Sequence, residues 1–179
     1  MIKTFFRNLA EKENGKIYYQ DEDISIGDGV RSPNVIFIVK FTYKENQITI
    51  LNRTGTAYVG EITCTLPSTS RPIQFELSSI SHLTNFFLRK KSRLKITSEN
   101  ENIKHFFKNN SALNKLKEIA KKEDFSPLIY CDPSEERKII AKYHLEFSDW
   151  TEVIEPIIEL YKNLADEFEN RTLSYYRSQ

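Results

Sequence analysis

Glycine is scarce in this chain, with five residues among 179. Loops that cradle phosphate groups need several glycines close together, because their backbone has to approach the ligand closely. Gly27 and Gly29 give one G-x-G inside GDGVRS, but no third glycine and no helical pattern follow, and Asp28 would repel a phosphate. The sequence therefore contains neither a Walker motif nor a dinucleotide-binding fingerprint, and we expect no cofactor of this kind.

Cysteine is also rare. Cys64 and Cys131 are the two cysteines, no C-x-x-C occurs, and neither has a nearby histidine to complete a metal site. A chain of this length does not need a disulfide framework to fold. We expect two buried, unpaired thiols in a reducing compartment, and no metal centre.

The three histidines show no ligand-like spacing, because His82, His105 and His144 lie on three different predicted elements. Each is expected to face solvent or to bind a neighbouring group. His144 lies close to Ser148 and Asp149, but a catalytic triad needs a serine on an exposed elbow and an oxyanion hole, and G-x-S-x-G is missing. We therefore predict no catalytic residue.

Long apolar runs and an excess of one charge are missing as well. The longest wholly apolar run is VIFIV, residues 35–39, far short of the ~20 residues that a membrane span needs. The start of the chain has no signal-peptide pattern. The 26 basic and 25 acidic residues nearly balance, whereas dedicated nucleic-acid binders are usually strongly basic. We expect a cytoplasmic protein without a membrane span and without a specific nucleic-acid partner.

An acidic run, DEDIS at residues 21–25, has oxygen ligands at positions 1, 3 and 5 of a calcium-binding loop. The two diagnostic positions fail, because Ile26 stands where that loop requires glycine and Ser32 where it requires glutamate. We instead predict that residues 16–33 hold a short strand, GKIYY, followed by a turn-rich, polar surface loop.

The residues that are abundant indicate a folded protein. Hydrophobic residues make up 39% and aromatic residues 12% of the chain, which argues against disorder. The length is sufficient for a real core, and no linker rich in Pro, Gly or Ser interrupts it. We predict one α+β domain over residues 1–179, with a strand-rich half (1–91), a helix-rich half (92–170) and a loosely ordered tail (171–179). The richness in Lys, Asn, Ile and Glu suggests a bacterial, AT-rich genome.

Alternation of apolar and polar residues predicts a largely antiparallel sheet of about six or seven strands, because short links join neighbouring strands. RNA-binding sheets display aromatic side chains on an open face, and Phe37, Phe41, Tyr43 and Tyr58 are candidates for that role. They align with aliphatic residues, so we assign them to the core. The segments with a strand pattern are 35–43, 47–53, 58–66, 73–77, 94–96, 125–131 and 139–147.

Helical spacing predicts helices packed mainly on one face of this sheet. One begins the chain, one follows Ser78 or Ser79 as N-cap, and two more follow residue 100. The last and longest helix should start with a capping box of Asp149 and Glu152, with Ser148 as an alternative cap, and Pro156 should bend its first turns. Its apolar stripe consists of Ile154, Ile157, Ile158, Tyr161, Leu164, Ala165 and Phe168.

A cationic stretch, FFLRKKSRLK at residues 86–95, is the most conspicuous local feature. The pattern fits the end of a helix, a turn and a half-buried strand, with all five cations exposed to solvent. The alternative is a strip that binds anions or a partner. The residues of this strip are Arg89, Lys90, Lys91, Arg93 and Lys95.

Three functions remain open on these grounds. The first is a non-enzymatic module that binds a protein partner or forms a homo-oligomer, and it rests on balanced charge and the lack of a catalytic motif. The second is a small-molecule binder with an apolar pocket between the sheet and the C-terminal helix. The third is an enzyme of unrecognised type whose active-site residues are scattered along the chain.

Overall fold

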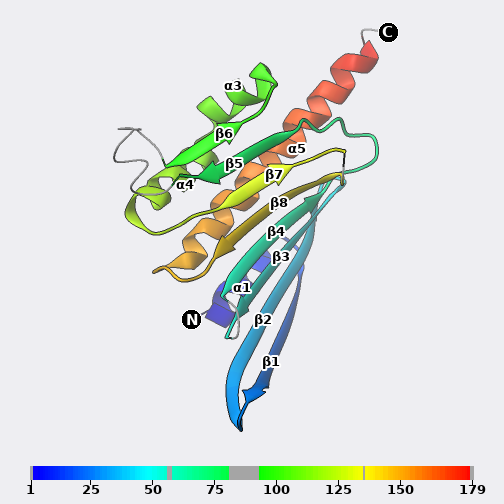
Figure 1. Ribbon diagram of the computed structural model, residues 1–179. Coiled ribbons are helices and arrows are strands. Elements are labelled where there is room, and N and C mark those ends of the chain that lie inside the picture. Colours follow the sequence, from blue (N-terminus) through cyan, green and yellow to red (C-terminus); the bar gives the residue numbers. More distant parts are fainter. Residues whose placement is uncertain (1, 56–57, 81–92, 135, 178–179) are drawn as a thin grey trace.

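The computed structural model describes residues 2–55, 58–80, 93–134 and 136–177, and Figure 1 shows their arrangement. In chain order the elements are α1 (Ile2–Lys12), β1 (Lys16–Gly27), β2 (Val30–Tyr43), β3 (Asn46–Thr54), β4 (Val59–Thr65), β5 (Phe75–Ser79), β6 (Leu94–Thr97), α3 (Glu101–Asn109), α4 (Ser111–Lys122), β7 (Leu128–Cys131), β8 (Lys138–His144), the 3-10 helix η1 (Trp150–Val153) and α5 (Ile154–Arg177).

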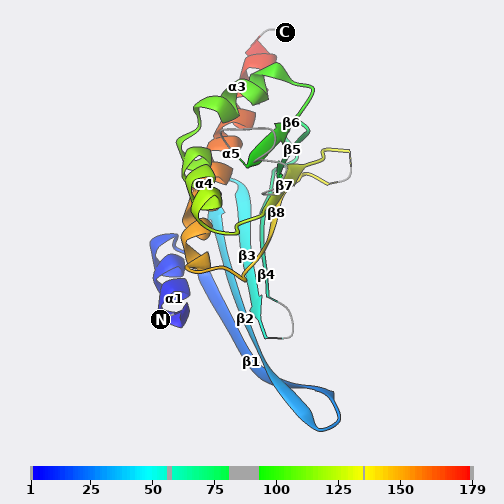
Figure 2. The ribbon, with the colours of Figure 1, turned by 60° about the vertical axis from the view of Figure 1, so that its left-hand side comes forward.

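Across the described residues, eight strands form one antiparallel sheet in the order β1-β2-β3-β4-β8-β7-β5-β6. Strands from both halves of the chain alternate in this order, because β7 and β8 lie between β4 and β5. The described helices lie on one face of the sheet, and none of them covers the other face (Figure 2). The predicted α+β fold is confirmed.

The polar loop predicted within residues 16–33 is wrong, and this region accounts for the higher strand count. β1 and β2 pair from Lys16 opposite Lys40 to Gly27 opposite Val30. Gly27 and Gly29 turn the hairpin with φ angles of 104° and 76°, which glycine adopts without a steric penalty. Most side chains here are exposed on both faces, so the alternation that normally indicates a strand is missing.

The core lies between the sheet and the helices. The apolar stripe predicted for the last helix is buried, with exposures of 4% or less from Ile154 to Phe168. Tyr161 also donates a hydrogen bond of 2.8 Å from its hydroxyl to the backbone carbonyl of Ile62 in β4. Because a buried tyrosine hydroxyl needs such a partner, this bond fixes the position of α5 across the sheet.

The start and the end of α5 differ from the prediction. Asp149 adopts φ 50° and makes no capping hydrogen bond with its side chain, so the capping box is wrong. The turn η1 comes first, and α5 begins at Ile154. Pro156 therefore lies in the first turn, where its missing N–H costs no intrahelical bond. The helix continues to Arg177, so residues 171–177 are helical instead of a loosely ordered tail.

Asparagine side chains form the N-caps of α3 and α4. Asn100 accepts hydrogen bonds from the N–H groups of Asn102 and Ile103 and begins α3, and Asn110 accepts one from Leu113 and begins α4. Ser78 and Ser79, expected to cap a helix, instead pair with Lys95 and Leu94 as part of β5. The body of the helix predicted after them lies within residues 81–92, outside the described part of the chain.

Ile157→Ala should lower the free energy of unfolding by about 2–5 kcal/mol, because it leaves a cavity at a side chain with 0% exposure. Leu173→Ala on the same helix is the matched control, since that leucine is 50% exposed and should cost less than about 1 kcal/mol. Urea denaturation of both variants measures the difference. Equal losses would mean that the stripe of α5 does not form the core.

Candidate functional site

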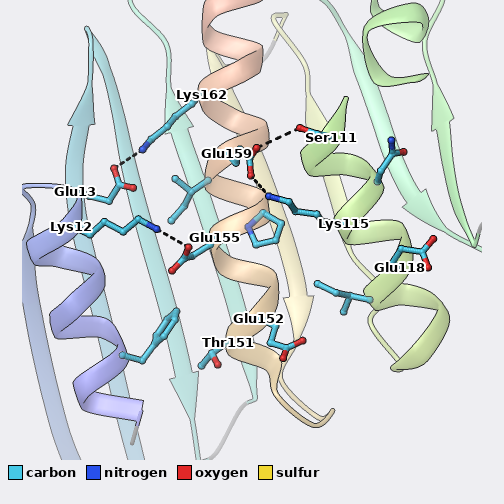
Figure 3. Close-up of a pocket in the computed structure, with 15 residues that line it drawn as sticks. Lys12, Glu13, Ser111, Lys115, Glu118, Thr151, Glu152, Glu155, Glu159 and Lys162 are labelled. Carbon is cyan, nitrogen blue, oxygen red and sulfur yellow. Dashed lines mark hydrogen bonds and ion pairs between the residues drawn. The ribbon is translucent and has the colours of Figure 1, made fainter. Parts of the chain in front are cut away.

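A groove with a volume of about 960 Å³ lies on the side of α5 that faces away from the sheet, between α1 and α4 (Figure 3). All of its lining residues come from the helical layer and the residue that follows α1. They are Phe5, Lys12, Glu13, Ser111, Asn114, Lys115, Glu118, Ile119, Thr151, Glu152, Glu155, Pro156, Ile158, Glu159 and Lys162.

The sequence of α5 gives this helix one apolar face and one charged face. Residues three and four positions apart share a helix face, so most of the apolar stripe faces the sheet, and charged residues between its members face outward. Glu155, Glu159 and Lys162 follow this spacing and line the groove, as does Glu152 in η1. The position of the groove is therefore a consequence of the amphipathic pattern of α5.

Apolar side chains form part of the surface of the groove. Pro156 and Ile158 of α5 are buried, and Phe5 of α1 and Ile119 of α4 are partly buried. These four residues come from three helices that surround the same space. A ligand with apolar side chains would remove this surface from water, at about 25 cal/mol per Å² of apolar area.

Two ion pairs join α1 and the residue that follows it to α5 along one side of the groove. Lys12 Nζ lies 2.7 Å from Glu155 Oε2, and Lys162 Nζ lies 2.6 Å from Glu13 Oε2. The hydrogen bond that Lys12 donates to the carboxylate of Glu155 raises the pKa of Lys12, which keeps that ammonium charged. The Lys12–Glu155 pair is more than half exposed, so its contribution to stability is small, in the range of about 0–1 kcal/mol.

A third ion pair joins α4 to α5 on the opposite side. Lys115 Nζ lies 2.9 Å from Glu159 Oε2, and the Ser111 hydroxyl donates to Glu159 Oε1 over 3.5 Å. Figure 3 shows that these contacts and those from α1 reach α5 from both sides. The two walls are thus connected to the floor of the groove by polar contacts.

Negative charge is in excess in the groove. Five glutamates and three lysines line it, and each lysine is already paired with one of the glutamates. Of the remaining two, Glu118 pairs with Lys121 on α4, a hydrogen bond that lowers the pKa of Glu118. Glu152 is exposed and has no ion-pair partner within the described residues. A cationic ligand would therefore meet one carboxylate, Glu152, that no described lysine or arginine neutralises.

The groove offers apolar and ionic contacts for binding. Within the described parts of the chain, no group of three or more His, Cys, Asp and Glu side chains comes together in a way that could hold a metal ion. No described helix is both long and apolar enough to cross a membrane.

The structure corrects one member of the predicted cationic strip. Arg93 is buried, with 4% exposure, although we expected it on the outer face of a strand. It precedes β6, and its guanidinium reaches the end of α4, where Nη1 donates to the carbonyls of Ala120 and Glu123 over 3.1 and 3.3 Å. A cation is favourable at this end of a helix.

The remaining members of the strip are only partly described. Lys95 is exposed, as predicted, and Leu94 beside it is buried. Arg89, Lys90 and Lys91 lie outside the described residues. Binding of an anion or a partner by this strip stays a prediction.

The other candidate residues do not line the groove. His105 and His144 are exposed, as expected, and His82 lies outside the described residues. Phe37 and Phe41 are core residues and Tyr43 is partly buried, but Tyr58 is 47% exposed, so its assignment to the core is wrong. The acidic run at residues 21–25 belongs to β1, not to a loop.

The residues of the groove were missed by sequence reasoning because they come from distant segments. Lys12 and Glu155, for example, are 143 positions apart. One signal was available: Glu152, Glu155 and Glu159 recur at helical spacing opposite the apolar stripe. This spacing indicates an acidic helix face, but not the helices on each side of it.

Arg93→Met should cost about 1.5–3 kcal/mol of stability, because hydrogen bonds from a charged donor to two buried or part-buried carbonyls are lost. Lys95→Met, two residues along, is the matched control and should change stability by less than about 0.5 kcal/mol. Chemical denaturation compares the two variants. Similar losses would contradict the buried position of Arg93.

Both cysteines should resist modification in the folded protein and react once it unfolds. They are buried and unpaired, and burial raises the pKa of each thiol to about 12. Only about one thiol in ten thousand is then ionised at pH 8. Titration with Ellman's reagent should find two thiols in unreduced protein in guanidinium chloride. Rapid reaction before denaturation would show that the strands around Cys64 and Cys131 open readily.

Comparisons with known proteins do not assign this chain to a family. No protein-family model, no curated protein and no solved structure matches it.

Proposed function

We propose that this protein is a non-enzymatic interaction module that binds a basic amphipathic helix of a protein partner in the groove over α5. The observation that carries the proposal is the combination of apolar side chains from three helices with an excess of carboxylates around them. Helix-in-groove recognition uses the same combination: an apolar face provides affinity, and charged flanks provide orientation.

The size of the groove suits this ligand. A helix with a diameter of about 10 Å occupies roughly 850 Å³ over two turns, close to the 960 Å³ of the groove. Anchors at positions i, i+3 and i+4 of the ligand would contact Phe5, Pro156 and Ile119, because those side chains line the same space from three helices.

The charge of the groove favours a positively charged ligand. Lys or Arg on the flanks of the bound helix would lie near Glu118 and Glu152, the two glutamates that do not pair with a lysine of the groove. An acidic helix would be repelled by the same carboxylates. Because these residues are exposed, the attraction should weaken as salt is added.

A small apolar ligand is the second candidate. It was expected between the sheet and the C-terminal helix, but large core side chains such as Tyr161 and Leu164 lie on that side of α5. The groove on the opposite side is within the usual size range of ligand pockets, about 300–1,000 Å³. Its many charged residues favour a peptide over an apolar small molecule.

A reducing, cytoplasmic location fits this role. Cys64 and Cys131 are unpaired thiols on different strands, β4 and β7. Proteins of oxidising compartments commonly use such residues in disulfides. We place the interaction with the partner in the cytoplasm on this basis.

Fluorescence anisotropy with a labelled Leu/Lys peptide of about 18 residues, written at helical spacing, tests the proposal. We expect saturable binding to the full-length protein. Glu118→Lys with Glu152→Lys should weaken it at least about tenfold, because two attractive charges become repulsive. Glu76→Lys with Glu99→Lys is the matched control, since neither residue lines the groove, and its affinity should stay unchanged.

Two peptide controls separate specific from non-specific attraction. A Leu/Glu peptide of the same spacing should not bind, and a Leu/Lys peptide with scrambled spacing should bind at least about tenfold more weakly. Equal binding of all three peptides, or none, overturns the proposal. Saturable binding of the uncharged dye Nile red that Ile119→Glu abolishes, without peptide binding, would instead support the small-ligand candidate.

A further inference from the structure

The hairpin of β1 and β2 extends beyond the rest of the sheet. β3 pairs with β2 only as far as Val35 opposite Thr54, whereas β1 and β2 continue to pair up to Gly27 and Val30. Figures 1 and 2 show this part projecting past the ends of β3 and β4. We call residues 21–34 the arm. A two-stranded ribbon of this kind is marginally stable alone in water, so contact with another surface would stabilise the arm.

The arm is strongly acidic. It carries four acidic residues against a single basic one, Arg31. The consecutive acids Asp21, Glu22 and Asp23 lie opposite Val35, Asn34 and Pro33, so β2 provides no cation across from them. All three are exposed, as is Val30 at the tip, with 54% of its surface accessible.

The uncovered face of the sheet carries apolar side chains near the base of the arm. Residues paired across antiparallel strands lie on the same face, which places Tyr18, Ile38 and Leu51 in one row across β1, β2 and β3. Ile36 and Val59 belong to the next row, on either side of Arg53. We call these five apolar residues the sheet patch. Tyr18 is 53% and Val59 37% exposed.

Positive charge surrounds the sheet patch. Lys16 and Lys40 lie directly opposite each other on β1 and β2, and like charges in that position repel. Arg53 lies within the sheet patch, and its Nε is buried without a hydrogen-bond partner among the described residues. Glu61 is the acidic residue in this part of the face, and it lies opposite Lys142. An anionic ligand here would relieve the repulsion between the two lysines.

From the arm and the sheet patch we infer that two copies of this chain form a dimer, with the arm of each copy lying on the sheet patch of the other. The acidic arm and the cationic surroundings of the sheet patch are complementary in charge, and both belong to the same two strands. A two-fold axis that crosses the strands between them brings each arm over the partner's sheet patch. Such an isologous contact closes after two copies.

The available area is in the range of stable interfaces. The face of β1 to β4 covers four strands at about 4.8 Å spacing and roughly ten residues at about 3.3 Å each, and with the arm this gives roughly 600–800 Å² per copy. Stable dimers bury about 800 Å² per partner. The groove lies over α5, and α5 lies on the other side of the sheet (Figure 2), so this contact leaves the groove accessible and does not depend on the function proposed for it.

Sedimentation equilibrium of the full-length protein is the first measurement. We expect a species of twice the 21.1 kDa of one chain, and its dissociation constant should rise with salt because the contact is partly ionic. A monomer over the whole accessible concentration range overturns the inference.

A charge exchange between two variants then tests the arrangement. Variant one carries Glu22→Lys and Asp23→Lys, which makes the arm basic; variant two carries Lys16→Glu and Lys40→Glu, which makes the face acidic. Each alone should dimerise at least about tenfold more weakly than the natural chain. Mixed together, they should form a one-to-one heterodimer, because both arm-to-face contacts again join opposite charges.

Lys108→Glu with Lys122→Glu on α3 and α4 is the matched control and should dimerise like the natural chain, since both lysines are exposed on the helical side. Circular dichroism confirms that each variant is folded. A dimer that neither variant weakens, or two weakened variants that fail to associate when mixed, overturns the inference. In the first case the dimer uses another surface, and in the second the cationic face attracts a different anionic partner.

Discussion

The packing of α5 across the sheet is the constraint on which the rest of the structure depends. Its apolar stripe fills the core, and the hydroxyl of Tyr161 binds the carbonyl of Ile62 in β4. The outer side of the same helix carries the glutamates that pair with Lys12 on α1 and Lys115 on α4. One helix thus fixes the core, holds its neighbours and forms the floor of the groove. The described helices all belong to this layer, so none of them covers the opposite face of the sheet.

The net charge of the chain is close to zero, but its acidic and basic residues gather on different surfaces of the folded protein. The chain has 26 basic and 25 acidic residues, yet carboxylates predominate in the groove and on the arm, while Lys16, Lys40 and Arg53 gather on the uncovered sheet face. Electrostatic attraction acts over roughly a Debye length, about 8 Å at physiological salt. Recognition of a ligand therefore depends on these local charged groups. The near-zero net charge, from which we expected no specific nucleic-acid partner, does not describe them.

Sequence reasoning succeeded where one face of an element is buried. Phe37 in β2 and Ile157 in α5 belong to clear periods of two and 3.6 residues, and both are core residues. It failed at the arm, where both faces meet water, and at Asp149, whose left-handed backbone prevents the expected cap. Arg93 was misplaced because strand alternation was extended to a residue outside the strand. The groove needed tertiary information, since its walls, α1 and α4, and its floor, α5, come from distant parts of the chain.

The positions of the two proposed surfaces have a consequence for binding strength. The groove lies over α5, on the side of the sheet that carries the described helices (Figure 2), and the sheet patch lies on the opposite face. A dimer joined through its sheet faces would therefore present two outward-facing grooves, one on each copy. A partner with two basic helices, or a partner that is itself dimeric, would then bind with an affinity raised by the effective concentration of the second site. Weak recognition by each exposed, salt-sensitive groove would be sufficient for such a bivalent contact.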